Sequence, residues 1–175
     1  MELVVVNGAN NIAKSVIRNL TSSGQYSKVR LLDFHAHRPS VYALQRELAA
    51  KGIELDKRLT KNAQALEIGM EGADKVVYFT HDYLSMVSCK NNFLIASSKI
   101  AKRQGTQQIL AVCPVEHDMA YSEDPKTWVE KRIDAEQEAI SANDNLTILN
   151  TDLVYGQDST YITHYMAQSA MAGSI

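Results

Sequence analysis

The sequence is poor in several features that point to particular classes of protein. Among its 175 residues are only two cysteines, Cys89 and Cys113, without metal-binding spacing, so they favour a reducing compartment over a disulfide scaffold. No apolar run approaches the roughly 20 residues of a membrane-spanning helix. Basic and acidic side chains nearly balance, 18 against 20, which gives no reason to expect binding to nucleic acid or to an anionic membrane surface.

The N-terminus also lacks the usual features of a signal or transit peptide. The first strand-like run begins at Glu2, so we expect any organelle address to be removed or unusual. There is no linker, internal repeat or low-complexity segment, and hydrophobic residues make up 45% of the chain, enough for a sizeable core. We therefore expect one domain over residues 1–175.

What is present is organised around residues 2–20. The run Leu3-Val4-Val5-Val6 is short, apolar and β-branched, which indicates a fully buried strand. A glycine turn follows, and apolar residues then recur at helical spacing from Ile12 to Leu20. A buried strand, a glycine turn and an amphipathic helix form the first half of a βαβ unit. In a doubly wound sheet this turn receives the pyrophosphate of a nucleotide.

The glycine pattern of this turn is incomplete. Gly8 supplies the first glycine of the dinucleotide fingerprint, whereas Asn11 stands at the second place and Ala13 at the third. Alanine still allows close packing of helix and strand, but the Asn11 side chain fills space needed for a phosphate contact. We take Gly8, Asn11 and Ile12 as the candidate phosphate-contacting residues, and we expect dinucleotide binding to be weak or absent.

The remaining chain alternates between strands and helices, which predicts an α/β fold with a parallel, doubly wound, Rossmann-like sheet. The expected strands after the first cover residues 28–33, 53–55, 75–80, 107–113 and 146–149. The expected helices cover residues 40–50, 63–70, 85–104, 128–140 and 159–170, with a turn at Val154-Tyr155-Gly156 before the last.

An acid ends the second expected strand. Asp33 lies 25 residues after Gly8, near the offset at which an acid holds the ribose hydroxyls of NAD. The alternatives are a surface charge at Asp33, or an Arg38 that meets the 2′-phosphate of NADP. His35 and His37 alternate in the same loop without further ligands, so no metal site is expected.

The order of these segments resembles the extended, atypical short-chain dehydrogenase/reductase family. The resemblance is carried by Val6-Asn7-Gly8-Ala9, Asp56, Gly72-Ala73-Asp74-Lys75-Val76-Val77, Lys131 with Ala135-Glu136, and Leu146-Thr147-Ile148-Leu149. It implies that Asp56 follows the third strand and approaches the adenine. It also implies that Lys131 contacts the nicotinamide ribose, the alternative being a solvated helix charge.

The catalytic pattern of that family is broken. The family places a tyrosine four residues before the lysine, and its phenol exchanges a proton with the substrate carbonyl. Here that position is Thr127, whose hydroxyl is far too weak an acid. Tyr121 lies ten residues from Lys131, and Cys113-Pro114 replaces the serine after the fifth strand. No catalytic residue is therefore assigned, and a pseudoenzyme is expected.

The closing run from Leu146 through Gly156 to Met166 is similar to that of the Rossmann-type accessory subunits of mitochondrial respiratory complex I. The resemblance implies a non-catalytic subunit on the matrix side of the inner membrane, with other complex I subunits as partners and NAD or NADP optional. We expect the family's C-terminal substrate lobe to be missing. A stand-alone oxidoreductase or dinucleotide sensor, in the cytoplasm, is the alternative.

Overall fold

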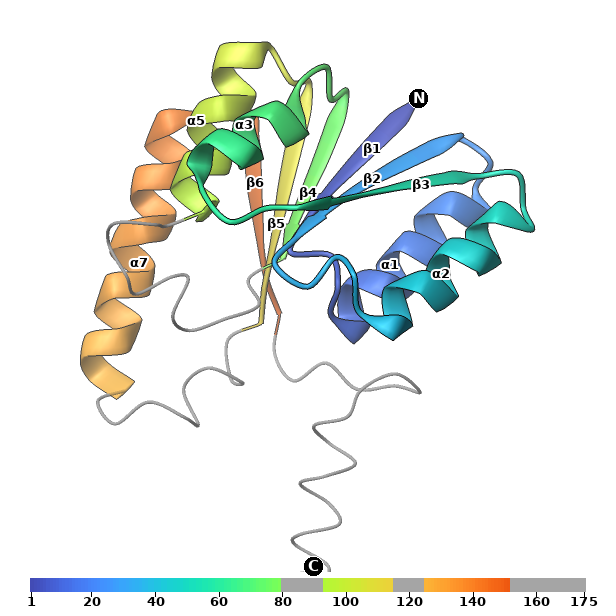
Figure 1. Cartoon of the computed structure of the whole chain (residues 1–175). Helices are drawn as coiled ribbons and strands as arrows, with labels where there is room; N and C mark the ends of the chain where they lie inside the picture. The colour runs from blue at the N-terminus through green and yellow to red at the C-terminus, as the bar shows by residue number, and fades with distance from the viewer. Residues whose placement is uncertain (80–92, 115–124, 152–175) are drawn as a thin grey trace, which may run out of the picture.

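A computed structural model of the chain describes residues 1–79, 93–114 and 125–151 (Figure 1). The described strands are β1 (Glu2–Val6), β2 (Lys28–Asp33), β3 (Glu54–Leu59), β4 (Lys75–Phe79), β5 (Gln108–Pro114) and β6 (Leu146–Thr151). The described helices are α1 (Asn11–Ser22), α2 (Pro39–Ala49), α3 (Ala63–Met70), α5 (Phe93–Gln104) and α7 (Pro125–Ala142). Among these helices none is long and apolar enough to cross a membrane.

The strands form one sheet in which every neighbouring pair is parallel, in the order β3-β2-β1-β4-β5-β6. This is the strand order of a doubly wound dinucleotide-binding fold. The predicted α/β fold class is therefore confirmed. Strand β1 lies in the middle, with Val6 opposite Leu32 of β2 on one side and Tyr78 of β4 on the other.

Helices cover both faces of the sheet. Figure 1 shows α1 and α2 together on one face, and α3, α5 and α7 on the other. Each face has its own apolar core: Leu3, Val5 and Leu31 point toward the first layer, whereas Val4, Val6 and Leu32 point toward the second. Because central strands are covered on both faces, they consist of nearly continuous apolar residues. This explains why the first strand was recognisable from its sequence.

The third strand is longer than predicted. The sequence indicated a strand over residues 53–55, whereas β3 extends from Glu54 to Leu59. The residues after Leu55 include Asp56, Lys57 and Arg58, which carry no apolar signal. Strand β3 is an edge strand of the described sheet, and charged side chains are usual at such edges, where they oppose pairing with other chains.

Other predicted boundaries are close to those observed. The fifth strand is shifted by one residue, β6 is two residues longer, and α7 extends beyond residues 128–140 at both ends. Helix α5 is described only from Phe93, so its predicted start near Ser85 lies outside the described residues. The turn at Val154 and the helix predicted over residues 159–170 also lie outside them.

A buried arginine joins three elements at the amino edge of the sheet. Arg30 of β2 is 7% exposed, and its Nη1 donates to the carbonyls of Gly69 at 2.7 Å and Glu71 at 2.8 Å. Its Nη2 lies 2.8 Å from the carboxylate of Glu2, and its Nε lies 3.8 Å from that of Asp56. Arg30 therefore ties the end of α3 to β1 and β3.

Candidate functional site

The candidate site lies at the carboxyl edge of the sheet, between β1 and β4. From this pair the strands continue outward in both directions, through β2 to β3 on one side and through β5 to β6 on the other. Doubly wound folds bind ligands in the crevice at such a switch point. The turn from β1 into α1 borders this place. The residues that form the turn and those that end β2 and β4 therefore decide what the site can hold.

The first two residues of the turn, Asn7 and Gly8, occupy positions that few residue types can fit. Asn7 has a φ of 58°, in the left-handed region that asparagine tolerates better than most residues. A Cβ at Gly8 would lie 2.9 Å from Cγ1 of Val5 and 3.0 Å from Cγ of Leu31. Gly8 is therefore required by packing of the turn against the sheet, whether or not a ligand binds.

Asn7 also bridges the switch point. Its amide N–H donates to the carbonyl of Leu32 in β2 at 2.7 Å, and its side-chain Nδ2 donates to the carbonyl of Phe79 in β4 at 2.9 Å. The two bonds connect the ends of β2 and β4 across β1. This role of Asn7 was not evident from the sequence, because Leu32 and Phe79 are both distant from it in the chain.

Helix α1 is capped by Asn10. The Oδ1 atom of Asn10 accepts the amide N–H of Ala13 at 2.7 Å, and its Nδ2 donates to the carbonyl of Asn7 at 2.9 Å. Asn11 and Ile12 follow as the first two helical residues and are partly buried, and Ala13 is fully buried against the sheet. The sequence analysis missed Asn10, although an asparagine directly before an amphipathic helix is a capping signal.

Asp33 turns into the protein at the end of β2. The residue is 3% exposed. Its Oδ2 accepts the amide N–H of Ala9 at 2.9 Å, and its Oδ1 accepts that of His35 at 2.6 Å. Asp33 is therefore not the surface charge that was one of its two readings. Its carboxylate holds the glycine turn, and the ribose contact stays a prediction.

Asp56 does not stand at the carboxyl end of its strand. It pairs with Arg30 in the register of β2 and β3, three residues before Asp33 pairs with Leu59. The carboxylate of Asp56 lies 2.8 Å from Nη2 of Arg58. The position expected from the family resemblance was wrong because β3 continues past the apolar residues, and Leu59 ends the strand in place of Asp56.

Lys131 and Arg132 lie near the middle of α7 and have opposite surroundings. Lys131 is exposed, whereas the Arg132 side chain is 6% exposed. Arg132 donates from Nε to Glu136 at 2.7 Å and from Nη2 to Asn150 of β6 at 2.5 Å. The basic group that α7 directs onto the sheet is thus Arg132, which the sequence analysis passed over.

Several other candidates lie beyond what the structure describes. Thr127 belongs to α7, and Cys113 to β5, but only their backbone is described. Tyr121 lies outside the described residues. The substitution of the catalytic tyrosine by Thr127 therefore stays an argument from the sequence. Within the described ranges, no three His, Cys, Asp or Glu residues are grouped so as to hold a metal ion.

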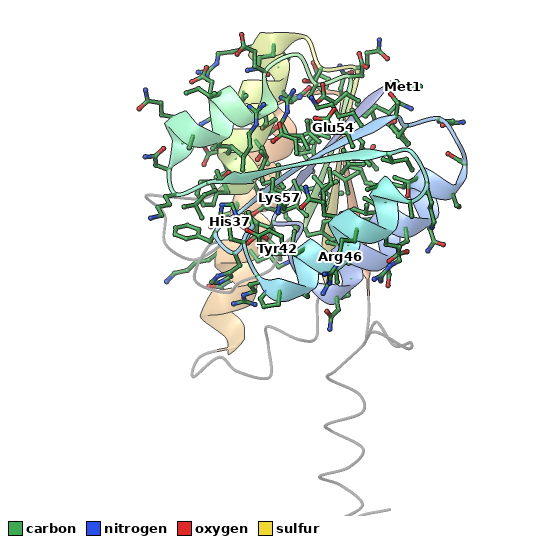
Figure 2. All side chains as sticks on the ribbon, turned by 45° about the vertical axis from the view of Figure 1, so that its right-hand side comes forward. Met1, His37, Tyr42, Arg46, Glu54 and Lys57 are labelled. Carbon is green, nitrogen blue, oxygen red and sulfur yellow. The ribbon has the colours of Figure 1, made fainter. Side chains whose placement is uncertain are left out.

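An aromatic and two basic side chains meet beside the edge strand: His37 from the loop after β2, Tyr42 from α2 and Lys57 from β3. Figure 2 shows His37, Tyr42 and Lys57 close together beside β3. The Nζ of Lys57 lies 3.3 Å from the centre of the Tyr42 ring, and Nδ1 of His37 lies 3.3 Å from the Tyr42 hydroxyl. The ring contact anchors the start of α2 to the edge strand.

The fold has many relatives among solved structures, although no family model and no curated protein matches the sequence. The triphenylmethane reductase of Citrobacter sp., complexed with NADP(H), aligns with a TM-score of 0.65 at 14% identity, over 98% of this chain and 55% of that one. The dTDP-glucose 4,6-dehydratase DesIV of Streptomyces venezuelae, with NAD and TYD bound, aligns with a TM-score of 0.66 at 16% identity, over 99% and 63%.

A putative NAD-dependent epimerase/dehydratase from Bacillus halodurans is also similar, with a TM-score of 0.62 at 17% identity, over 91% of this chain and 74% of that one. The chain has a Rossmann fold. Identities this low establish the fold and leave the activity open. The chain spans 55% of the Citrobacter reductase and 63% of DesIV.

Proposed function

We propose that this Rossmann domain is a non-catalytic, structural subunit of a larger assembly. The proposed assembly is mitochondrial respiratory complex I, on the matrix side of the inner membrane, as the sequence resemblance implies. One observation carries the proposal: two groups at the β1–α1 turn that a cofactor would engage, the amide of Ala13 and the carboxylate of Asp33, are already bonded within the chain.

The residues at the turn do not fit a dinucleotide held in the manner usual for this fold. That manner needs free amides at the helix start for the pyrophosphate and an accessible acid for the ribose. The amide of Ala13 is bonded to Asn10, and Asp33 is buried with each of its oxygens bonded to an amide. Of the three first-turn amides of α1, those of Asn11 and Ile12 do not bond to the Asn10 side chain.

The catalytic group of the family is also missing. A tyrosine and a lysine four residues apart would supply the proton and hold the nicotinamide ribose. This chain has Thr127 and Lys131 at those places, and Lys131 is exposed while Arg132 contacts the sheet. A threonine hydroxyl cannot donate the proton at neutral pH, so the proposal includes no hydride or proton transfer.

The first prediction concerns turnover. We expect the purified chain to oxidise neither NADH nor NADPH above background with any of a panel of aldehyde, ketone and quinone substrates. Lys131→Ala is the control, and it should give the same background rate. A rate well above background that disappears in Lys131→Ala would refute the proposal. That result would favour the alternative, a stand-alone oxidoreductase like the structural neighbours.

The proposed partner surface lies on α7, away from the turn. Ile133 and Ile140 are seven residues apart on α7, and each is nearly half exposed. Leu149 of β6 is also nearly half exposed, but it faces the other side of the sheet from Ile148, which packs in the core beneath α7. Residues seven apart lie on the same side of a helix. Exposed aliphatic side chains along one side of a helix are typical of surfaces that contact another protein.

The second prediction tests this surface. A tagged chain expressed in its source cells should co-purify with respiratory-chain subunits identified by mass spectrometry. We expect Ile140→Lys to reduce their recovery several-fold, because it places a charge in the apolar contact. Ile68→Lys is the matched control, since Ile68 is 56% exposed on α3. Recovery of a lone monomer from mitochondria, with no such subunits, would contradict the proposed assembly.

A further inference from the structure

The hydrogen bonds around the β1–α1 turn fall into two groups, one centred on Asn7 and Asn10 and the other on Asp33, which the backbone joins at Leu32–Asp33. We call the two groups together the turn network. It consists of the side chains of Asn7, Asn10 and Asp33 and the backbone groups of Asn7, Ala9, Ala13, Leu32, His35 and Phe79. It links the carboxyl ends of β1, β2 and β4 to the start of α1. All of these ends border the switch point of the sheet.

Each hydrogen-bonding group in the turn network has its donor or acceptor within the network. The amide of Ala13, a first-turn donor of α1, has Asn10 as its acceptor. The acid that ends β2, Asp33, has the amides of Ala9 and His35 as its donors. These are the two kinds of group that this fold elsewhere offers to the pyrophosphate and to the ribose. The chain therefore satisfies internally two of the groups that a dinucleotide would satisfy, the Ala13 amide and the Asp33 carboxylate.

The orientation of Asn10 is fixed by two bonds of opposite kind. Its Nδ2 donates to the carbonyl of Asn7 at 2.9 Å, which directs its Oδ1 toward the amide of Ala13 at 2.7 Å. A flipped amide would place a donor against each donor and an acceptor against each acceptor. The Asn7 carbonyl is itself held in place, because Asn7 is bonded to both Leu32 and Phe79.

We propose that Asn10 and Asp33 are internal ligands of the turn, and that the Asn10 side chain keeps a pyrophosphate off the amide of Ala13. This rests on the proposed function, because a structural subunit needs an edge that holds its shape without a cofactor. It goes further by assigning the loss of dinucleotide binding to one side chain. Asn11, which the sequence indicated as the obstruction to the phosphate, then contributes less to it than Asn10 does.

The decisive variant is Asn10→Gly. Glycine is accepted at the residue before a helix at small cost, so the variant should fold. We expect calorimetry to detect no binding of NADH to the natural chain up to about 1 mM, and binding at least about tenfold tighter in Asn10→Gly. Asn62→Gly is the matched control, because Asn62 caps α3 in the same way, 2.8 Å from the amide of Ala65. It should gain no affinity.

Hydrogen exchange of single amides gives a second readout, independent of calorimetry. In the natural chain the Ala13 amide should exchange slowly, and NADH should not change its rate. In Asn10→Gly the same amide should exchange faster, and NADH should slow it again. In Asn62→Gly the Ala65 amide should exchange faster and not respond to NADH.

Two results would overturn the proposal. One is binding of NADH to the natural chain with slowed exchange at Ala13, which would show that Asn10 yields to the pyrophosphate. The other is an Asn10→Gly variant that folds and binds no better than Asn62→Gly. Neither result bears on catalysis. Turnover of carbonyl substrates by the natural chain would refute the proposed function, whichever way the binding experiments come out.

Discussion

Replacing Arg30 by leucine should lower the free energy of unfolding by about 3 kcal/mol, the lower end of the range for breaking a buried ion pair. Leucine would leave the carbonyls of Gly69 and Glu71 without their donor, and the carboxylate of Glu2 without its partner. We expect the lower end because Glu2 and Asp56 still reach water, with side chains 23% and 25% exposed.

Arg58→Leu is the control for this prediction. Arg58 contacts the same carboxylate of Asp56, at 2.8 Å, but its side chain is 38% exposed. Exposed ion pairs contribute about 0.2–1 kcal/mol, so urea denaturation should show a much smaller change. Equal losses in the two variants would mean that the buried contacts of Arg30 with α3 and β1 do not determine its effect.

Asp33→Ala should destabilise the fold by about 2–4 kcal/mol. The substitution leaves the buried amide of Ala9 and the partly buried amide of His35 without acceptors, and each unsatisfied buried group costs about 1–3 kcal/mol. Asp33→Asn retains one acceptor oxygen and should therefore lie between alanine and the natural residue. Chemical denaturation of the three proteins measures the series.

Asp144→Ala is the control for Asp33. Asp144 pairs with Lys102 at 3.1 Å, but its side chain is 89% exposed, so its removal should change the unfolding free energy by no more than about 0.5 kcal/mol. A stability of Asp33→Ala equal to that of Asp144→Ala would contradict the role of Asp33 in the turn network.

The fold was predictable where burial leaves a simple pattern. Strand β1 has helices on both faces, so its residues from Leu3 to Val6 are all apolar and stand out from the sequence. Strand β3 lies at the edge, where Asp56 and Arg58 pair with each other and face solvent in part. Its charged half has no periodic signal, and the prediction stopped at the last apolar residue.

The candidate site was predictable in position but not in its bonds. The sequence placed Asp33 at the end of the second strand, and β2 does end there. Its partner Ala9 is 24 residues away, and no local pattern indicates that pair. The same limit applies to Lys131 and Arg132, because neighbouring helix residues differ in direction by about a quarter turn, and only packing decides which one meets the sheet.

The strand order also has a consequence for how the chain leaves the ribosome. Chains emerge from the N-terminus, and parts that emerge first can fold first. Strand β1 is made first, but one of its neighbours, β4, begins only at Lys75, and the bond from Asn7 reaches to Phe79. The edge of β1 that faces β4 must therefore wait, unpaired, while more than seventy later residues are made. One edge of the apolar run from Leu3 to Val6 therefore stays open until β4 has been made.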